Sequence, residues 1–531
     1  MASLIQALLF IVTIGTARWL WAILSGRRAL NNIPGPQSPS FWTGNLKELY
    51  SLNGWDFHRE LGEKYGGVVR INGLLGEKQL YVFDRKSLHQ ILVKDQDIFE
   101  EPHYLICYSR VSFGEGIFSA LGEQHKKQRK NLTPVFSAAH LRQMVPIFFG
   151  VGKRLRSALE SRVKDGPKEL WMTRTALELV GQAGLGHSFD PLDTDEIPPY
   201  IQSVKQLQVT TYKMALAVRY ILPWAVTIGS PKFRRFIVGI LPWKNLHDAR
   251  DIVDTLYSTA VHIYNLKKAA LEAGDEAVSA QIVKGKDIIS ILMKDNSNAS
   301  STERLSEDEI IGQVSVPTSS ALSRTLHLLA QYPDVQEKLR QELRSAQQEG
   351  ADVSYDQLNS MVYLDAICRE TLRLYPPVPF LGRTARKDVA LTTSTPVTTV
   401  DGSTVTEIPV PAGTEVFFSI LAANRNPAVW GPDCLEWKPE RWLSPLPQSI
   451  ADAHLPGIYR DSNLLTFGGG GRACIGFKFS QLEMKVVLCL LVERLKFSLS
   501  DKDISWQMSS ITVPSVDGTK SQLPLKVELA S

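Results

Sequence analysis

One cysteine stands between a run of glycines and a long apolar segment near the C-terminus of this 531-residue chain. The stretch LLTFGGGGRACIGFKFSQLEMKVVLCLLVERL, from Leu464 to Leu495, contains Cys474. Apolar residues recur at helical spacing from Phe479 to Leu490, which predicts a helix beginning just after the cysteine. Such a loop has three interpretations: a phosphate-binding loop, a structural cysteine, or a thiolate held ready for a metal ion.

The phosphate-binding interpretation fails on spacing. A P-loop needs a glycine, four residues, and then Gly-Lys-Ser/Thr. Here Gly471 and Gly476 are suitably spaced, but Phe477 follows where a lysine is required. The loop also contains no Gly-x-Gly-x-x-Gly, because the last glycine would fall on Ala473 or Cys474.

The metal-ligand interpretation accounts for more of the loop than a structural cysteine does. A helix N-terminus offers N–H donors and a positive dipole end, both of which stabilise a thiolate. Glycines 468–471 let the backbone approach a flat ligand closely, and Arg472 is placed to reach a carboxylate on that ligand. A buried structural cysteine would not require this glycine setting.

Composition limits the classes of protein that the chain can belong to. Hydrophobic residues make up 44%, charged residues 21%, and the net charge of +4 is too small to argue for nucleic-acid binding. There is no Cys-x-x-Cys, which excludes a common zinc pattern and, with the scattered spacing, favours a reducing compartment without disulfides. The five cysteines are Cys107, Cys368, Cys434, Cys474 and Cys489.

The N-terminal residues predict a membrane anchor. The segment Leu4–Leu24 is apolar except for four residues and is just long enough to span a bilayer. Arg27 and Arg28 follow it, which places the rest of the chain on the cytosolic side. A helix lying in the membrane interface is the alternative. Residues 25–41 then read as a basic and proline-rich hinge.

The remaining chain reads as one body, mainly helical with a small β portion. Val68–Asp84 alternates like a hairpin, and strands return between Leu391 and Phe418. From about Gln124 to Ala330 the pattern is mostly helical. Ser306 and Glu309 form a Ser-x-x-Glu capping box, which predicts a helix running toward Gln331.

The cysteine loop resembles the heme-binding loop of the cytochrome P-450 family, Phe-x-x-Gly-x-Arg-x-Cys-x-Gly. The matching residues are Phe467, Gly470, Arg472, Cys474 and Gly476. The resemblance implies heme b as cofactor, with the cysteine as the axial thiolate ligand of the iron. It further implies that the phenylalanine shields the sulfur and that the arginine binds a heme propionate.

Other stretches occur in the family's order. RETLRLYPPVP contains Glu370 and Arg373, resembling the family's Glu-x-x-Arg motif, which alone would be only a surface i,i+3 pair. KPERW supplies Arg441, which the resemblance joins to that pair in a buried ion network. GEQHKKQRK resembles the family's Trp-x-x-x-Arg helix, and it makes His125 and Arg129 candidates for propionate binding.

Arg383 is a third candidate for the propionates, ten residues past Arg373. The resemblance runs from about residue 32 to the C-terminus and is strongest to fungal members of the microsomal type. It implies a cytochrome P-450 fold over residues 42–531, preceded by a single transmembrane helix over residues 4–24.

One motif of the family is incomplete. Its distal helix carries Ala/Gly-Gly-x-Asp/Glu-Thr-Thr/Ser, whose acid and threonine deliver protons to bound oxygen. Here Thr318 follows Pro317 with no acid beside it, and the nearest acid upstream is Glu309. About seven residues, or two helical turns, are missing between Gln313 and Thr318. A gene model lacking part of an exon and a divergent protein with altered oxygen chemistry both explain this.

The resemblance implies a membrane-anchored heme-thiolate monooxygenase of the endoplasmic reticulum, with its catalytic domain in the cytosol. Electrons would come from NADPH–cytochrome P-450 reductase, since the chain has no nucleotide-binding fingerprint. The substrate would be a lipophilic small molecule, by analogy a fungal terpenoid, contacted by Tyr104–Phe118 and Val378–Gly382. The incomplete motif keeps open a heme-thiolate isomerase or dehydratase or a poorly active form, and a non-enzymatic heme-binding protein is the third hypothesis.

Overall fold

The computed structural model describes residues 30–171, 180–189, 198–274, 287–298, 300, 303–312, 319–346, 352–457, 464–518 and 520–530. The predicted anchor, residues 4–24, and Thr318 lie outside these residues. Within the described ranges, no helix combines the length and the apolar character needed to cross a membrane. The described chain is mainly helical with small sheets, as the sequence predicts, and it divides into two compact units that are treated separately below.

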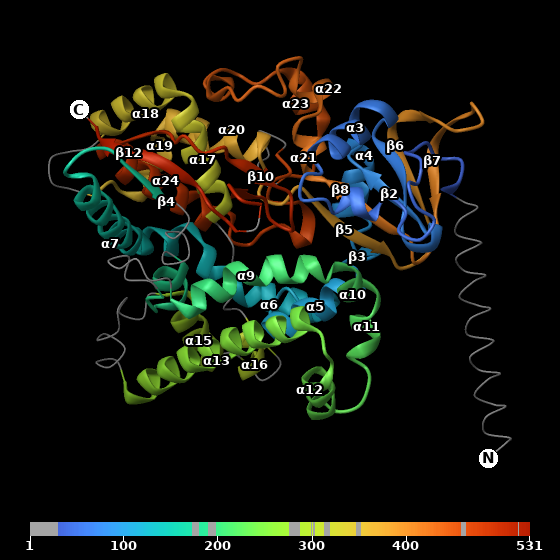
Figure 1. Cartoon of the computed structure of the whole chain (residues 1–531), viewed down its shortest axis with the longest axis horizontal. Coiled ribbons are helices and arrows are strands. Elements are labelled where there is room, and N and C mark those ends of the chain that lie inside the picture. Colours follow the sequence, from blue (N-terminus) through green and yellow to red (C-terminus); the bar gives the residue numbers. More distant parts are fainter. Residues whose placement is uncertain are drawn as a thin grey trace. The chain divides into compact units, whose positions relative to one another are not determined.

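The first unit contains residues up to 102, 378–434 and 447–473. Its centre is a five-stranded sheet in the order β1-β2-β8-β5-β3. Figure 1 labels four of these strands, β2, β8, β5 and β3. The predicted hairpin is confirmed, because β1 (Val68–Asn72) and β2 (Lys78–Val82) pair antiparallel from Val68–Val82 to Asn72–Lys78. The remaining strands of this sheet are β3 (Phe99–Glu100), β5 (Phe380–Ala385) and β8 (Glu415–Ser419).

A second hairpin in this unit consists of β6 (Val389–Thr398) and β7 (Thr404–Val410). It agrees with the strands expected between Leu391 and Phe418. The part of the proposed hinge that the structure describes is packed: Leu30 and Ile33 are buried, and Pro34 accepts a hydrogen bond from the backbone of Arg70.

The unit's helices are α2 (Leu46–Leu49), α3 (Trp55–Tyr65), η1 (Leu74–Gly76), α4 (Arg85–His89), η2 (Gln90–Lys94), α21 (Ile420–Asn424), α22 (Pro427–Trp430), α23 (Gln448–Ala453) and η6 (Gly470–Arg472).

The second unit contains residues 103–377, 435–446 and 474–531. Its small sheets are β4-β12-β9 and β10-β11, built from Lys168–Trp171, Pro524–Leu529, Leu495–Leu499, Ser505–Gln507 and Val513–Ser515. Its helices are α5 (His103–Phe113), α6 (Gly122–Leu132), η3 (Pro134–Phe136), α7 (Ala138–Val163), η4 (Val180–Leu185), α9 (Pro199–Lys213), α10 (Ala215–Tyr220), α11 (Leu222–Ala225), α12 (Pro231–Ile240), α13 (Lys244–Ala273), α15 (Ile288–Asn298), α16 (Glu307–Ile311), α17 (Ser319–Gln331), α18 (Pro333–Ala346), α19 (Tyr355–Ser360), α20 (Val362–Leu374), η5 (Pro439–Trp442) and α24 (Phe477–Arg494).

The core of this unit is built around α24, the helix predicted to follow the cysteine. Nearly every side chain from Phe479 to Val492 is buried, so the helix is covered on all sides and not amphipathic. It packs on α7, where a Cβ on Gly152 would lie only 2.4 Å from a methyl group of Leu490. A side chain at position 152 would therefore require the Leu490 side chain to shift.

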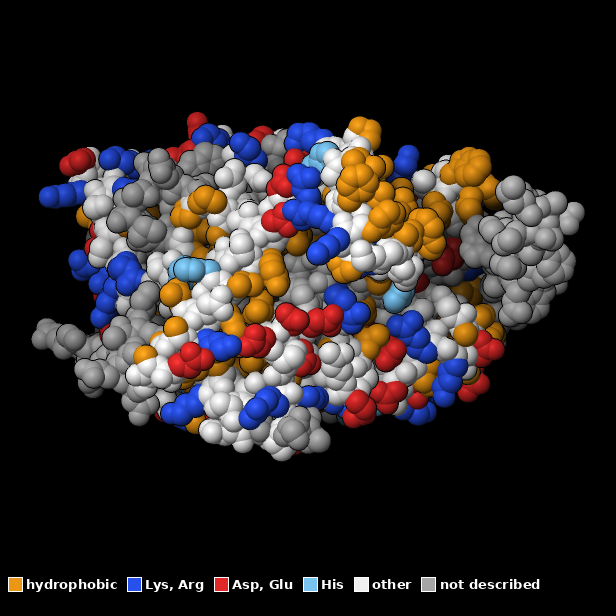
Figure 2. Space-filling view, turned by 90° about the horizontal axis from the view of Figure 1, so that it is seen from below, with side chains coloured by type: hydrophobic (Ala, Val, Ile, Leu, Met, Phe, Trp, Pro, Cys, Tyr) orange, Lys and Arg blue, Asp and Glu red, His pale blue; other side chains and the backbone are white. Residues whose placement is uncertain are grey.

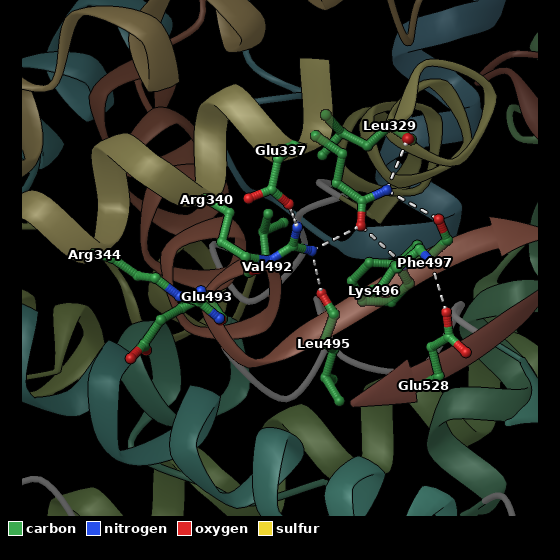
Figure 3. Close-up of polar contacts among 11 residues, drawn as sticks. Leu329, Glu337, Arg340, Arg344, Val492, Glu493, Leu495, Lys496, Phe497 and Glu528 are labelled. Carbon is green, nitrogen blue, oxygen red and sulfur yellow. Dashed lines mark hydrogen bonds and ion pairs between the residues drawn. The ribbon is translucent and has the colours of Figure 1, made fainter. Parts of the chain in front are cut away.

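Two polar side chains on α18, Gln336 and Arg340, donate hydrogen bonds to backbone carbonyls near the C-terminal ends of α17 and α24. Arg340 donates to the carbonyls of Val492 (2.9 Å) and Leu495 (3.0 Å), just at the C-terminus of α24 (Figure 3). Gln336, one turn earlier on α18, donates to the carbonyls of Leu329 and Phe497. Because the last carbonyls of a helix have no partner within the helix, these side chains allow both helix ends to be buried.

Candidate functional site

The helix predicted behind Cys474 is confirmed, since α24 begins at Phe477 with Gly476 as its N-cap. The cysteine therefore lies two residues before the N-cap. Phe467, at the other end of the loop, is half-buried. The sequence interpretation of the cysteine loop as a turn leading directly into a helix matches this local structure.

The glycines of the loop are required by neighbouring protein backbone. Gly470 has φ +66°, and a Cβ there would lie 1.8 Å from the carbonyl oxygen of Leu92. A Cβ on Gly469 would lie 1.7 Å from the carbonyl oxygen of Pro456. Any side chain at either position would therefore displace the loop. The backbone N–H of Gly471 donates to the side chain of Gln96 (2.9 Å), which fixes the loop further.

Cys474 differs from the other cysteines, all five of which lie in the described part of the chain. All are free, and Cys474 is exposed whereas the other four are buried. Surrounding protein nevertheless desolvates the thiol and raises its pKa. The backbone N–H of Gly476 and the positive charge of Arg129 both act in the opposite direction and favour the thiolate. An accessible sulfur near a cation and a helix start suits a metal ligand better than a structural role.

The two candidates on α6 lie on one side of that helix. His125 is buried, so it is not an ordinary surface histidine, and Arg129 is half-buried one turn later. Burial lowers the pKa of Arg129, and the charge of a Cys474 thiolate raises it. The structure therefore brings Arg129 close enough to Cys474 for each to affect the other's ionisation.

The candidates Arg383 and Arg472 meet at one carboxylate. Arg383 Nη2 lies 3.3 Å from Oε1 of Glu101, and Arg472 Nη2 lies 3.2 Å from Oε2. Arg383 is buried on β5, and this burial lowers its pKa, an effect that Glu101 opposes. The Glu101 carboxylate thus holds two guanidinium groups together, and guanidinium groups are well suited to binding a further anion such as a carboxylate.

The Glu-x-x-Arg pair is fully buried and does not lie on the surface. Glu370 and Arg373 have no exposed side-chain surface and form two hydrogen bonds of 2.8 and 2.9 Å. Arg441 Nε lies 3.4 Å from the same carboxylate. The structure thus joins the three residues that the sequence placed in one network, and the guanidinium of Arg373 also donates to the carbonyl of Glu436.

Sequence reasoning missed two members of these clusters. Trp442 donates its indole N–H to Glu370 (2.9 Å) from the turn η5. Its position in KPERW, beside Arg441, offered a signal, because a tryptophan N–H removed from water usually finds an acceptor. Glu101 offered none, since nothing local in the sequence links it to Arg383 or Arg472.

The two segments predicted to contact the substrate lie on different elements. Tyr104–Phe118 contains most of helix α5, and Val378–Gly382 leads into β5.

Glu309, the nearest acid before the incomplete motif, stabilises local structure at the start of α16. It completes the predicted capping box at Ser306, which the structure confirms. Its carboxylate also accepts hydrogen bonds from Gln128 (2.9 Å) and Gln124 (3.4 Å). Although partial burial opposes ionisation, these bonds lower the pKa of Glu309 overall. Residues 313–318 of the motif lie outside the described residues, so the role of Thr318 stays a prediction.

The residues present fit a heme. In the second unit, one exposed cysteine offers a thiolate donor with Arg129 near it. In the first unit, Arg383 and Arg472 offer guanidinium groups of the kind that bind a carboxylate. Among the described residues, no group of three or more histidine, cysteine or acidic side chains is arranged to hold a bare metal ion. A cofactor that brings its own equatorial ligands needs only the single thiolate.

Comparison with known proteins identifies the family. Residues 34–517 match the family model described as Cytochrome P450. The chain is 51% identical over 511 residues to Cytochrome P450 monooxygenase 91 of Postia placenta, covering 94% of each chain. It is 40% identical over 543 residues to a ganoderic acid synthetase of Ganoderma lucidum, covering 98% of this chain and 99% of the relative.

A third relative is a cytochrome P450 monooxygenase of Hericium erinaceus, 37% identical over 521 residues and covering 94% of each chain. The chain therefore belongs to the cytochrome P450 family, and the family resemblance seen in its motifs is confirmed. It is a cytochrome P450 monooxygenase, an oxidoreductase, and its relatives named here are fungal.

Proposed function

We propose that the chain binds heme b through the Cys474 thiolate and oxidises a lipophilic small molecule. The observation that carries this proposal is the accessible thiol of Cys474, placed at the start of α24 and beside Arg129, in a chain of this family. When bound, the heme supplies the oxygen-activating chemistry. The side chains of this protein supply binding, orientation and proton handling.

Each candidate residue receives one role in this proposal. Cys474 holds the iron, and Phe467, Gly470 and Gly476 shape the loop around the sulfur. The buried network of Glu370, Arg373 and Arg441 fixes α20 to η5, so that the surrounding core is rigid. Four cationic or imidazole side chains bind the heme propionates, namely His125, Arg129, Arg383 and Arg472.

Thr318 is the proposed proton-handling residue, and it acts without a neighbouring acid. Glu309 does not replace that acid, because its carboxylate is occupied by Ser306, Gln128 and Gln124. Without this proton relay, an isomerase or dehydratase that needs neither oxygen nor reductase remains the second candidate function. The incomplete motif favours that candidate.

The proposed substrate is a terpenoid of fungal secondary metabolism. The support is the likeness to a ganoderic acid synthetase over nearly the whole of both chains, since ganoderic acid is a terpenoid.

The proposed electron donor is NADPH–cytochrome P-450 reductase, because monooxygenases of this family generally use a reductase. A cationic surface steers an acidic partner. On α6, Lys126 pairs with Glu123 and Lys130 pairs with Glu303, so these two lysines are less suited to such a surface. Lys478 is exposed and has no carboxylate partner among the described residues.

We place the protein on the endoplasmic reticulum membrane with its catalytic domain in the cytosol. The apolar sequence Leu4–Leu24 and the following Arg27 and Arg28 support this location. A broad apolar surface over α10–α12 supports it independently, and Figure 2 shows apolar side chains gathered on the face that carries α12. Its members are 36–67% exposed: Leu216, Tyr220, Ile221, Trp224, Phe233, Phe236, Ile240, Leu241 and Trp243.

Reconstitution with reductase tests the function. We expect NADPH and oxygen to be consumed only when reductase and a terpenoid substrate are present, with a product heavier by one oxygen atom. Conversion without NADPH would instead support the isomerase or dehydratase. Location is tested by deleting residues 1–29: heme content should persist, and membrane binding should weaken without disappearing because the α10–α12 surface remains.

A further inference from the structure

Helix α6 has one polar face that is fully engaged by the segment before the distal helix. This face is formed by residues spaced i, i+3, i+4 and i+7 along the helix, at positions 124, 127, 128 and 131. Every one of these side chains donates a hydrogen bond to residues 303–309. The acceptors are Glu309 Oε1 for Gln124 (3.4 Å) and Gln128 (2.9 Å), the carbonyl of Arg304 for Lys127 (2.8 Å), and the carbonyl of Glu303 for Asn131 (3.0 Å).

Gln128 is the buried centre of this contact. It has no exposed surface, and its amide nitrogen also donates to the carbonyl of Glu115 (2.9 Å), so both amide hydrogens have an acceptor. The other oxygen of Glu309 accepts from the backbone N–H of Ser306 (2.8 Å) at the N-cap of α16. The Gln128–Glu309 bond therefore links the middle of α6 directly to the first turn of α16.

The far end of α16 is held by close packing against the backbone of the segment before α6. A Cβ added to Gly116 would lie 2.1 Å from the carbonyl oxygen of Gly312, and one added to Gly312 would lie 2.4 Å from the nitrogen of Gly116. The two segments are in direct backbone contact, and neither can shift toward the other. The segment preceding α6 and the end of α16 are thus fixed together on both sides of the Gln128–Glu309 bond.

We propose that Gln128 and Glu309 are positioning residues that set the orientation of α6, and with it the direction in which His125 and Arg129 point. These two side chains lie beside Gln128 on the same helix, and a small rotation of α6 moves them together. The proposal rests on the proposed propionate-binding role of His125 and Arg129. It also assigns Glu309 to structure and not to proton delivery.

The test exchanges the amide of Gln128 and the carboxylate of Glu309 between the two positions. Gln128→Glu faces the Glu309 carboxylate with a second acid, and Glu309→Gln removes the charge that strengthens the bond. The double variant restores one carboxylate–amide pair with the roles reversed, and the amide oxygen introduced at position 309 can still accept from Ser306. The measurement is the rate of heme transfer from the ferric holoprotein to excess apomyoglobin, together with the heme reduction potential.

We expect each single variant to release heme about tenfold faster, as for loss of one charge-assisted buried hydrogen bond. The double variant should recover part of that loss, because a carboxylate at position 128 still cannot donate to the carbonyl of Glu115. The matched control is Gln336→Glu, which alters an equally buried glutamine that bonds Leu329 and Phe497. It should lower stability without changing the potential. If the single variants do not fold, Lys127→Met removes a more accessible link of the same face and should give roughly twofold to threefold faster release.

Two results would overturn the proposal. One is a double variant in which the fold increase in the rate of heme release equals the product of the two single-variant increases. The other is Glu309→Gln with unchanged heme release but more peroxide formed per NADPH, which would return Glu309 to proton delivery. A wild-type protein without the thiolate band of the ferrous–CO complex would refute the proposed function itself, so the two failures are distinguishable.

Discussion

The indole N–H of Trp442 donates a 2.9 Å hydrogen bond to the buried carboxylate of Glu370. That carboxylate also receives Arg373 and lies 3.4 Å from Arg441. The network therefore contains a neutral donor as well as two cations. A buried carboxylate that loses a donor keeps its charge but not its solvation, so each donor contributes to stability.

Trp442→Phe should destabilise the fold by about 1.5–3 kcal/mol, the range for a hydrogen bond to a charged group. Trp437→Phe is the matched control, since Trp437 donates to the neutral hydroxyl of Thr371 at 3.1 Å. It should cost only about 0.5–1.5 kcal/mol. Urea unfolding of both variants measures the difference. Equal losses would show that Glu370 does not depend on the indole.

Cys474→Ser should abolish thiolate ligation, because a serine hydroxyl stays protonated and binds iron poorly. The ferrous–CO spectrum of the purified variant should lack the thiolate band. Cys489→Ser provides the control: this cysteine is free and fully buried in α24, and its variant should keep the band despite lower stability. A Cys474→Ser protein that still shows the band would exclude this residue as the ligand.

Acid should destabilise the first unit through His58. Burial lowers the pKa of His58 to about 4, and the carbonyl of Leu49 only partly offsets this. The unfolded histidine takes up a proton near pH 6.5, whereas the folded one stays neutral until about pH 4. Stability is therefore complete above pH 6.5 and falls as the pH drops toward 4, by roughly 3 kcal/mol in all.

His58→Gln should flatten this dependence, because glutamine does not titrate. Free energies of urea unfolding at about pH 7 and pH 5, on either side of the unfolded pKa, measure it. The exposed His89→Gln is the control and should keep the wild-type slope. A His58→Gln protein as sensitive to acid as the wild type would assign the effect to other groups.

Lys478→Glu should slow electron transfer from the reductase and flatten its salt dependence, because this exposed lysine has no carboxylate partner among the described residues. Lys126→Glu should have a smaller effect, since Lys126 is already paired with Glu123 at 2.8 Å. Stopped-flow reduction under carbon monoxide measures both rates. Identical rates for the two variants and the wild type would place the reductase elsewhere.

The chain as written should handle oxygen poorly. Loss of a positioned proton donor typically costs about a hundredfold or more in rate, and only Thr318 remains of the acid–threonine pair. Much of the reducing power should therefore appear as peroxide. Inserting about seven residues of the family pattern before Pro317, with an acid directly ahead of it, should raise the product formed per NADPH. Tight coupling in the unaltered chain would contradict the prediction.

Local signals in the sequence predicted local structure well. The capping box at Ser306 marked the start of α16, and alternation marked the β1–β2 hairpin, because both depend on residues a few positions apart. The strands β3 and β5 were missed. The two residues of β3 carry no alternation, and β5 pairs with β8, a strand that is distant along the chain.

The candidate site divides in the same way. Motif spacing identified Cys474 and the Glu370–Arg373 pair, whose members are neighbours along the chain. Glu101 could not be found from the sequence, because its two arginine partners lie hundreds of residues away and their contact depends on tertiary structure. The sequence predicted Glu309 as a member of the capping box and as the acid nearest the incomplete motif, but its bonds to Gln124 and Gln128 on α6 depend on tertiary structure.

The place of α24 along the chain affects how this protein is made. Residues 477–494 form the centre of the second unit, yet they pack on α7, which is completed hundreds of residues earlier. Strand β12 likewise supplies the partner of β4 only at residues 524–529. During synthesis, the apolar faces of α7 and β4 therefore wait uncovered until residues 477–494 and 524–529 have been made. Closure of this core, and with it the setting of Cys474, comes long after α7 is complete, so the early helices spend much of synthesis without their final partners.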